Sequence, residues 1–259
     1  MKNDNAQDPR STMELVNVLL TNRDEDADVA GESAYWNAMS CLLQRGTGEV
    51  FNAAKSLSIS ECELEQRIGC GILAQLGSPV FPFAAESFPL VASVLRRTDH
   101  LDTLANAICA LGWLQDVRGV DLVLPYIDYK DEDIRYWVTH ALTAMDQDKR
   151  SIDGLIRLSS DSSASVRDWA AFGLGSQTEM DSTAIREALI ARLDDSDIIV
   201  RGEALVGLAK RQDQRVVEPL RQALESGVYG KEVSDYAGEA LDAIEEIARY
   251  PDLWKWKNG

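Results

Sequence analysis

VRDWAAFGLG, residues 166–175, is the clearest copy of a pattern that recurs through most of the chain. Taking Arg167 as an anchor, Ala170 and Gly173 lie three and six positions later, and Leu174 lies seven positions later. These offsets fall on one face of an α-helix. Small residues on that face allow a neighbouring helix to approach closely. The stretch therefore predicts a helix that packs against a similar helix.

The same offsets return at a nearly constant period. The five clear anchor positions are Leu104, Arg135, Arg167, Arg201 and Ser234, which are 31, 32, 34 and 33 residues apart. Weaker copies begin at Tyr35 and Arg67. A second apolar run lies between successive anchors, as in residues 185–193. Each unit is therefore expected to be a helical hairpin, and such hairpins bury their apolar faces only by stacking on one another.

The motif D-x-D-x-V-R-x-x-A-x-x-A-L-G in residues 131–142, 162–175 and 195–208 resembles the HEAT repeat. It is closest to the short variety that is also found in phycobilin lyase-like proteins. The resemblance implies an all-α fold, an α-solenoid of about six to seven helical hairpins over residues 13–248. It also implies a ladder in which Arg135, Arg167 and Arg201 pair with nearby acidic residues, and which Leu104 and Ser234 interrupt.

Local signals complete the expected domain organisation. Residues 1–12 are polar and are expected to be disordered. Residues 249–259 contain Trp254 and Trp256, and we expect them to form a capping tail over the last repeat, with an exposed docking peptide as the alternative. Ser60 and Glu63 have the spacing of a capping box. The segment 77–82, GSPVFP, predicts an irregular connection, either a functional protrusion or a tolerated insertion.

The charge balance restricts the class of partner. The chain carries 43 acidic and 26 basic side chains, a formal net charge of −17. Binding to nucleic acid normally requires a basic surface that displaces counterions, so it is not expected. The acidity serves either general solubility or the attraction of a basic protein. The first ten residues, MKNDNAQDPR, hold no apolar signal region, and no apolar run reaches membrane-spanning length, so a cytoplasmic protein without membrane contact is expected.

The sequence offers no recognisable catalytic machinery. It has two histidines, and its four cysteines are not spaced as metal ligands. Nucleophile-elbow, phosphate-binding and dinucleotide-binding motifs are missing. We therefore expect no metal and no cofactor, and we lean towards a non-enzymatic protein. Two alternatives stay open: a bilin lyase or isomerase-like enzyme subunit, and a nucleic-acid binder similar to the helical-repeat DNA glycosylases.

A candidate binding surface follows from the resemblance, because the helices that begin at the anchors line the concave side of HEAT arrays. Offsets of one, two and five residues from each anchor should point away from the second helical layer. The expected partner-binding residues are Tyr136, Trp137, His140, Asp168, Trp169, Phe172, Glu203, Asp235, Tyr236 and Glu239. Aromatic anchors beside carboxylates are typical of a surface that binds a basic protein. The alternative is that Trp137 and Trp169 are core residues between repeats. The resulting hypothesis is a protein-binding module, such as a bacterial immunity or regulatory protein, of unknown oligomeric state.

Overall fold

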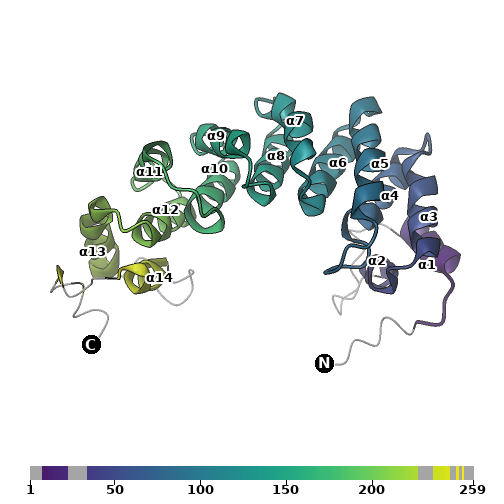
Figure 1. Cartoon of the computed structure of the whole chain (residues 1–259), viewed down its shortest axis with the longest axis horizontal. Coiled ribbons are helices and arrows are strands. Elements are labelled where there is room, and N and C mark those ends of the chain that lie inside the picture. The colour runs from purple at the N-terminus through teal and green to yellow at the C-terminus, as the bar shows by residue number, and fades with distance from the viewer. Residues whose placement is uncertain (1–7, 23–33, 227–235, 246–248, 251–252, 254–259) are drawn as a thin grey trace. The chain divides into compact units, whose positions relative to one another are not determined.

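The structure is a computed structural model that describes residues 8–22, 34–226, 236–245, 249–250 and 253. Throughout these residues the regular elements are helices, and the chain forms an α-solenoid of stacked helical hairpins (Figure 1). The all-α prediction is confirmed. The chain divides into two compact units, residues 1–123 and 124–259, which are described separately.

The first unit contains seven α-helices and one 3-10 turn in its described residues. They are α1 (Thr12–Thr21), α2 (Ala34–Arg45), α3 (Gly48–Ser58), α4 (Glu63–Gln75), α5 (Ala84–Arg97), α6 (Leu101–Leu114), η2 (Val117–Gly119) and α7 (Val120–Val123). The expected anchors Tyr35, Arg67 and Leu104 lie in α2, α4 and α6, and their small or apolar offsets Ala38, Cys70 and Ala107 are fully buried. The sequence register is therefore correct in this unit.

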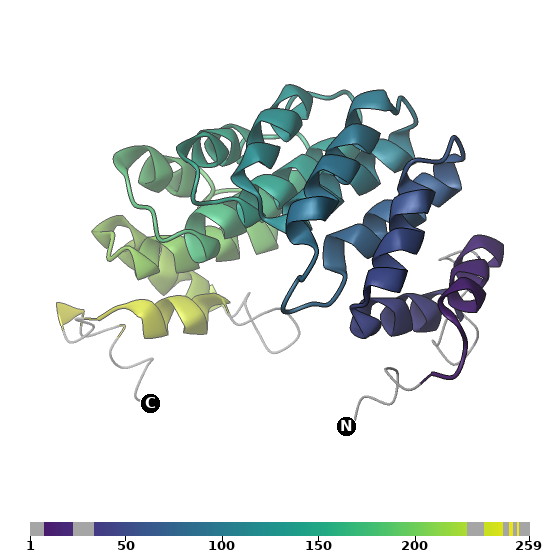
Figure 2. The same ribbon diagram turned by 45° about the vertical axis from the view of Figure 1, so that its right-hand side comes forward.

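Close backbone packing joins the hairpins of the first unit. A Cβ atom added to Gly69 of α4 would lie 2.6 Å from the backbone nitrogen of Ser58 in α3. The connection at residues 76–83 is non-helical, as expected, and forms the long blue loop at the lower ends of α4 and α5 (Figures 1 and 2). Val80 at its tip is 80% exposed.

The predicted capping box of Ser60 and Glu63 is wrong. Cys62 is the N-cap of α4 and makes no side-chain capping bond. The Glu63 carboxylate instead accepts hydrogen bonds from the hydroxyls of Thr98 and Thr103. A capping box does form at the start of α1, where Ser11 and Glu14 satisfy each other's backbone amides.

The second unit repeats the hairpin with greater regularity. Its elements are η3 (Leu124–Tyr126), α8 (Glu132–Ala144), α9 (Lys149–Leu158), α10 (Ala164–Phe172), the π-helical segment η4 (Gly173–Gln177), α11 (Thr183–Ile190), α12 (Ile198–Lys210), η5 (Gln214–Val216), α13 (Val217–Ser226) and α14 (Tyr236–Ala243). Helices α8, α10 and α12 lie side by side, with α9 and α11 forming a second layer over them (Figure 1).

The interior of the second unit is built from the residues at the repeat offsets. Ala170 and Leu174 of one repeat and Ala204 and Leu208 of the next are fully buried. A Cβ atom added to Gly207 of α12 would lie 2.5 Å from the Cα of Gly175 in η4, so the two backbones touch where each has a glycine. The anchor pattern therefore identifies the residues that control the spacing between repeats.

The ends of the array are only partly described. Residues 1–7 and 254–259, with Trp254 and Trp256, lie outside the described residues, and the capping tail stays a prediction. Leu253, just before them, is fully buried, as a residue covering the core would be. In the described part of the chain, no helix combines the length and the apolar character needed to cross a membrane.

Candidate functional site

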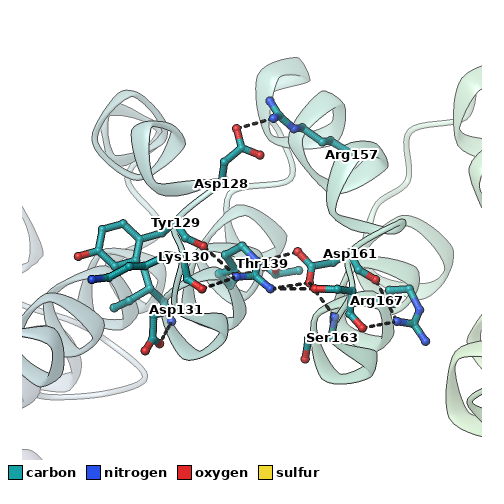
Figure 3. Close-up of polar contacts among 12 residues, drawn as sticks. Asp128, Tyr129, Lys130, Asp131, Thr139, Arg157, Asp161, Ser163 and Arg167 are labelled. Atoms are coloured by element: carbon teal, nitrogen blue, oxygen red, sulfur yellow. Dashed lines mark hydrogen bonds and ion pairs between the residues drawn. The ribbon is translucent and has the colours of Figure 1, made fainter.

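An arginine–aspartate ladder orders the helices that carry the candidate site (Figure 3). Nε and Nη2 of Arg135 donate to the carboxylate of Asp161 at 2.7 and 2.9 Å. The same two nitrogens of Arg167 donate to Asp195 at 2.8 and 2.7 Å. Both pairs are largely buried and bidentate, the arrangement in which such pairs are strongest. Each rung ties one anchor helix to the loop that begins the next repeat.

Each ladder arginine also holds the turn before its own helix. Nη1 of Arg167 donates to the carbonyls of Asp161 and Ser162 at 2.9 and 3.1 Å. Arg201 makes the same contacts with the carbonyls of Asp195 and Ser196, at 2.7 and 3.2 Å. Asp161 and Asp195 therefore each serve two repeats, one through the carboxylate and one through the carbonyl.

The sequence analysis did not assign these two aspartates. Each lies six residues before the next anchor arginine, and that spacing is the signal that would have found them. The equivalent position before Ser234 is Val228, so the sequence offers Arg201 no carboxylate at that place. Hydrogen bonds from Arg167 hold the pKa of Asp195 below its usual value, although burial opposes them.

The expected aromatic residues of α8 and α10 form one continuous cluster. Trp169 lies at its centre, with ring centroids 6.0 Å from Tyr136, 5.1 Å from His140 and 5.5 Å from Phe172. Trp137 completes it, 5.1 Å from Tyr136 and 5.6 Å from His140. The rings meet edge to face, the arrangement that aromatic side chains prefer.

All five of these side chains are half-buried. Trp169 packs on the neighbouring repeat and still keeps part of its surface in solvent. Neither extreme expectation for Trp137 and Trp169, a fully exposed position or a core position, describes them. We call the partly exposed surface of α8, α10, α12 and α14 around this cluster the anchor-helix face.

The expected acidic residues differ in their surroundings. Asp168 of α10 is half-buried, and Glu239 of α14 is exposed, 3.3 Å from the ammonium of Lys210. Glu203 of α12 was expected at the surface, but it is only 9% exposed. Asp235 lies outside the described residues.

Glu203 is buried because the next repeat covers it. Tyr236 of α14 is half-buried and lies over Gly202, where an added Cβ atom would come within 2.3 Å of its ring. Tyr236 also hydrogen-bonds to Glu203, and the hydroxyl of Ser176 in η4 donates to the same carboxylate at 3.4 Å. The carboxyl group is thus enclosed by hydroxyls and by neighbouring helices.

Burial gives these two carboxyl groups unusual acidities. It raises the pKa of Asp168 to about 6, with a contribution from the charge of Asp197. Burial raises the pKa of Glu203 to about 7, and the charge of Asp168 adds to the effect. Neither carboxyl forms an ion pair with a lysine or arginine of the described residues. The anchor-helix face thus holds two carboxyl groups whose ionised forms lack a counter-charge there.

The imidazole of His140 belongs to the aromatic cluster. Burial lowers its pKa, so the ring is neutral at physiological pH. Among the described residues, no three His, Cys, Asp or Glu side chains are grouped so as to hold a metal ion. The arrangement is suited to contact with an apolar and cationic surface.

Comparison with known proteins supports the repeat architecture. Protein YibA of Escherichia coli K12 is 33% identical over 113 residues, which is 44% of this chain and 40% of YibA. The crystal structure of E. coli YibA superposes with a TM-score of 0.71 at 22% identity, covering 98% of this chain and 88% of that one. The complex of CpcE and CpcF of phycocyanin lyase from Nostoc sp. PCC7120 gives a TM-score of 0.52 at 16% identity, covering 96% of each chain.

A designed armadillo repeat protein in complex with peptide (KR)4 is a more distant structural neighbour. Its TM-score is 0.50 at 14% identity, covering 77% of this chain and 98% of that one. The pattern of the HEAT-repeat family itself matches residues 88–175 and 152–242. Together with the seven anchor helices α2, α4, α6, α8, α10, α12 and α14, this match shows that the chain belongs to the HEAT-repeat family.

Proposed function

We propose that this protein is a non-enzymatic interaction module whose anchor-helix face binds a basic segment of a protein partner. The observation that carries the proposal is the contrast between two groups of acids. Asp161 and Asp195 in the repeat loops are neutralised by ladder arginines, whereas Asp168 and Glu203 on the face have no such cation among the described residues.

The aromatic cluster supports the same conclusion. Large aromatic side chains that keep part of their surface exposed are common anchors in protein interfaces. Trp169 adjoins Asp168 in sequence and contacts the rings of α8. A lysine or arginine side chain bound to this face can form a cation–π contact with a ring and an ion pair with a carboxylate. The net charge of −17 attracts such a partner from a distance.

The fold is compatible with this kind of ligand. The designed armadillo repeat protein named above, a stack of short helices, was solved in complex with the peptide (KR)4. That likeness concerns the fold only, so the charge and the aromatic residues of this chain support the choice of ligand. In its specific form the proposal is a bacterial immunity or regulatory protein that covers a basic surface of its partner.

Binding of (KR)4 to the full chain tests the proposal directly. Isothermal titration calorimetry at pH 8 and low salt should show a one-to-one complex. Trp169→Ala should weaken it by about fivefold or more, because a truncated aromatic anchor costs at least about 1 kcal/mol. Asp168→Lys should weaken it at least as much, since it replaces an attraction by a repulsion.

The control is Asp153→Lys, which makes the same charge change in α9. Asp153 is exposed and pairs with Lys149 within its own helix, away from the anchor-helix face. Wild-type affinity in all three variants would show that the peptide binds elsewhere, and no binding to the wild type would refute the proposed function. A natural partner should be captured from cell extract by the wild type and by Asp153→Lys, but not by Asp168→Lys.

A further inference from the structure

The carboxyl groups of Asp168 and Glu203 indicate a more specific binding role for one part of the anchor-helix face. They lie at consecutive repeats, on α10 and α12, and the charge of Asp168 raises the pKa of Glu203. Resting on the proposed function, we propose that these two residues seat a single lysine or arginine side chain of the partner, and that Glu203 gives up a proton to solvent as that cation binds.

The geometry provides the walls of such a seat. Glu203 is enclosed by Ser176 of η4 and Tyr236 of α14, both of which hydrogen-bond to its carboxyl group. The aromatic rings of Trp169 and Phe172 lie on α10 beside Asp168, 5.5 Å apart. In the proposed seat, a bound cation would contact a carboxyl oxygen of each residue and a ring face, the combination that binds guanidinium and ammonium groups.

Glu203 is partly protonated before the cation binds, which explains why binding releases a proton. With a pKa of about 7, Glu203 is protonated in about half of the molecules at neutral pH. A bound cation favours the ionised carboxylate and lowers this pKa. The proton released from the carboxyl oxygen passes to the buffer, and no other bond changes. Binding should therefore strengthen as pH rises from 6 to 8.

Asp168, with a pKa of about 6, is mostly ionised at pH 7 and should add only about a tenth of a proton to the release. The remaining charged groups near Glu203 do not produce the same signal. Glu239 of α14 is exposed and pairs with Lys210, while burial lowers the pKa of His140 of α8. Arg211, which follows α12, donates to backbone carbonyls of Gly175 and Gly207. The charged groups of α11 and η5 are paired with each other and with nearby acids: Arg186 with Asp181 and Asp213, and Arg215 with Glu187 and Asp213.

Calorimetry with the full chain measures the released proton. The probe is (KR)4 with an acetylated amino terminus, so that the peptide itself does not titrate between pH 6 and 8. Titrations at pH 7 in phosphate and in Tris, whose ionisation enthalpies differ, should report release of about half a proton per peptide. The dissociation constant should be about ten to twenty times larger at pH 6 than at pH 8, because ionisation of Glu203 contributes about tenfold and ionisation of Asp168 about twofold.

Two variants separate the seat from a general charge effect. Glu203→Gln keeps the size and a hydrogen-bonding group but has no proton to release, so binding should lose most of its pH dependence. Asp153→Asn removes one acidic charge from α9 and should leave the proton release unchanged. A circular dichroism melt checks that both variants fold. Asp168→Asn, whose side chain is less buried, provides the second test and should weaken binding at pH 8.

The possible failures are distinguishable. If (KR)4 does not bind at pH 8, both the proposed function and the proposed cation seat are refuted. Binding that is lost in Trp169→Ala but releases no proton would leave the proposed function standing and overturn the seat. Release of about half a proton that persists at pH 7 in Glu203→Gln would also overturn it, because Asp168 alone accounts for only about a tenth of a proton.

Discussion

At the scale of single residues, Glu203 has a stability cost as well as its proposed binding role. Its folded-state pKa is about 7, above the ordinary value of 4.5. An acid with a raised pKa stabilises the folded state least when it is ionised, so this contribution is lost as pH rises from below 4.5 through 7. The empty protein therefore keeps a carboxyl group that is unfavourable at neutral and higher pH.

Glu203→Gln should raise the free energy of unfolding by about 2 kcal/mol at pH 8, since each unit of pKa shift corresponds to about 1.4 kcal/mol and relaxation reduces the total. At pH 4, where Glu203 is protonated, the variant and the wild type should have nearly equal stability. Urea unfolding at the two pH values measures the difference. An equal gain at both would mean that amide packing, and not charge, causes it.

The repeat offsets predicted residues of the core well and residues of the face only in part. Ala170 and Ala204 are buried, as the pattern predicts. Each lies three residues after its anchor arginine, and that position faces the neighbouring helix. The burial of Glu203 depends on Tyr236, which lies over Gly202 in the next repeat. Such a contact between repeats depends on side-chain size in two helices and is not visible in the periodicity of one.

At the scale of helices, the contact between η4 and α12 depends on two glycines. Gly207→Ala should lower the free energy of unfolding by about 1 to 3 kcal/mol, because the new methyl group overlaps the backbone of Gly175. Gly71→Ala is the matched change inside α4, where a new Cβ atom would lie 3.7 Å from Cε of Met39. That variant should be neutral or more stable, by up to about 1 kcal/mol from helix propensity.

Thermal melting of the two glycine variants beside the wild type provides the measurement. Similar melting temperatures for Gly207→Ala and Gly71→Ala would show that the helices adjust their spacing freely. The sequence alone identified Gly207 as an interface residue, since it lies six positions after Arg201. Gly175 closes the motif of the preceding repeat, but the sequence did not show that these two glycines meet.

The ladder is also a property of paired elements. Removing one partner of a buried ion pair leaves an uncompensated charge, so Asp195→Ala should destabilise the protein by about 3 kcal/mol or more. Asp116→Ala removes an aspartate whose ion pair with Arg118 is more exposed. Once the separate cost of losing the capping bond to the Arg118 amide is subtracted, loss of this ion pair should cost less than about 1 kcal/mol. Chemical denaturation of both variants gives the comparison. Equal losses would show that the ladder adds nothing beyond an ordinary surface pair.

Sequence reasoning placed the helices well but not all of their beginnings. Asp131 and Asp197 cap α8 and α12 with their side chains, as their position before the anchor suggests. Ser60 and Glu63 had an equally good capping spacing, yet Glu63 binds the hydroxyls of Thr98 and Thr103 instead. Those threonines are 35 and 40 residues away, so a local motif gives no sign of the competition.

At the scale of the whole chain, the period of 31 to 34 residues predicted the anchor helices of the regular repeats. The division into units at residues 123 and 124 was not anticipated, because the repeats were treated as one array. A sequence signal coincides with it. Leu104 occupies an anchor position, and Tyr129 stands six residues before the next anchor, so neither residue type of a ladder rung is present in that repeat.

Net charge acts over the whole molecule and should govern the rate of association. A chain of charge −17 attracts a cationic peptide over distances of about the Debye length, roughly 10 Å at 0.1 M salt. Stopped-flow fluorescence with (KR)4 should show an association rate at least about tenfold slower at 0.5 M than at 0.02 M salt. Neutralising the distant Asp153 should change that rate only slightly. Trp169→Ala should act mainly on the dissociation rate, because ring contacts form after the encounter. An association rate that does not change with salt concentration would mean that the acidity of this chain serves solubility and does not attract its partner.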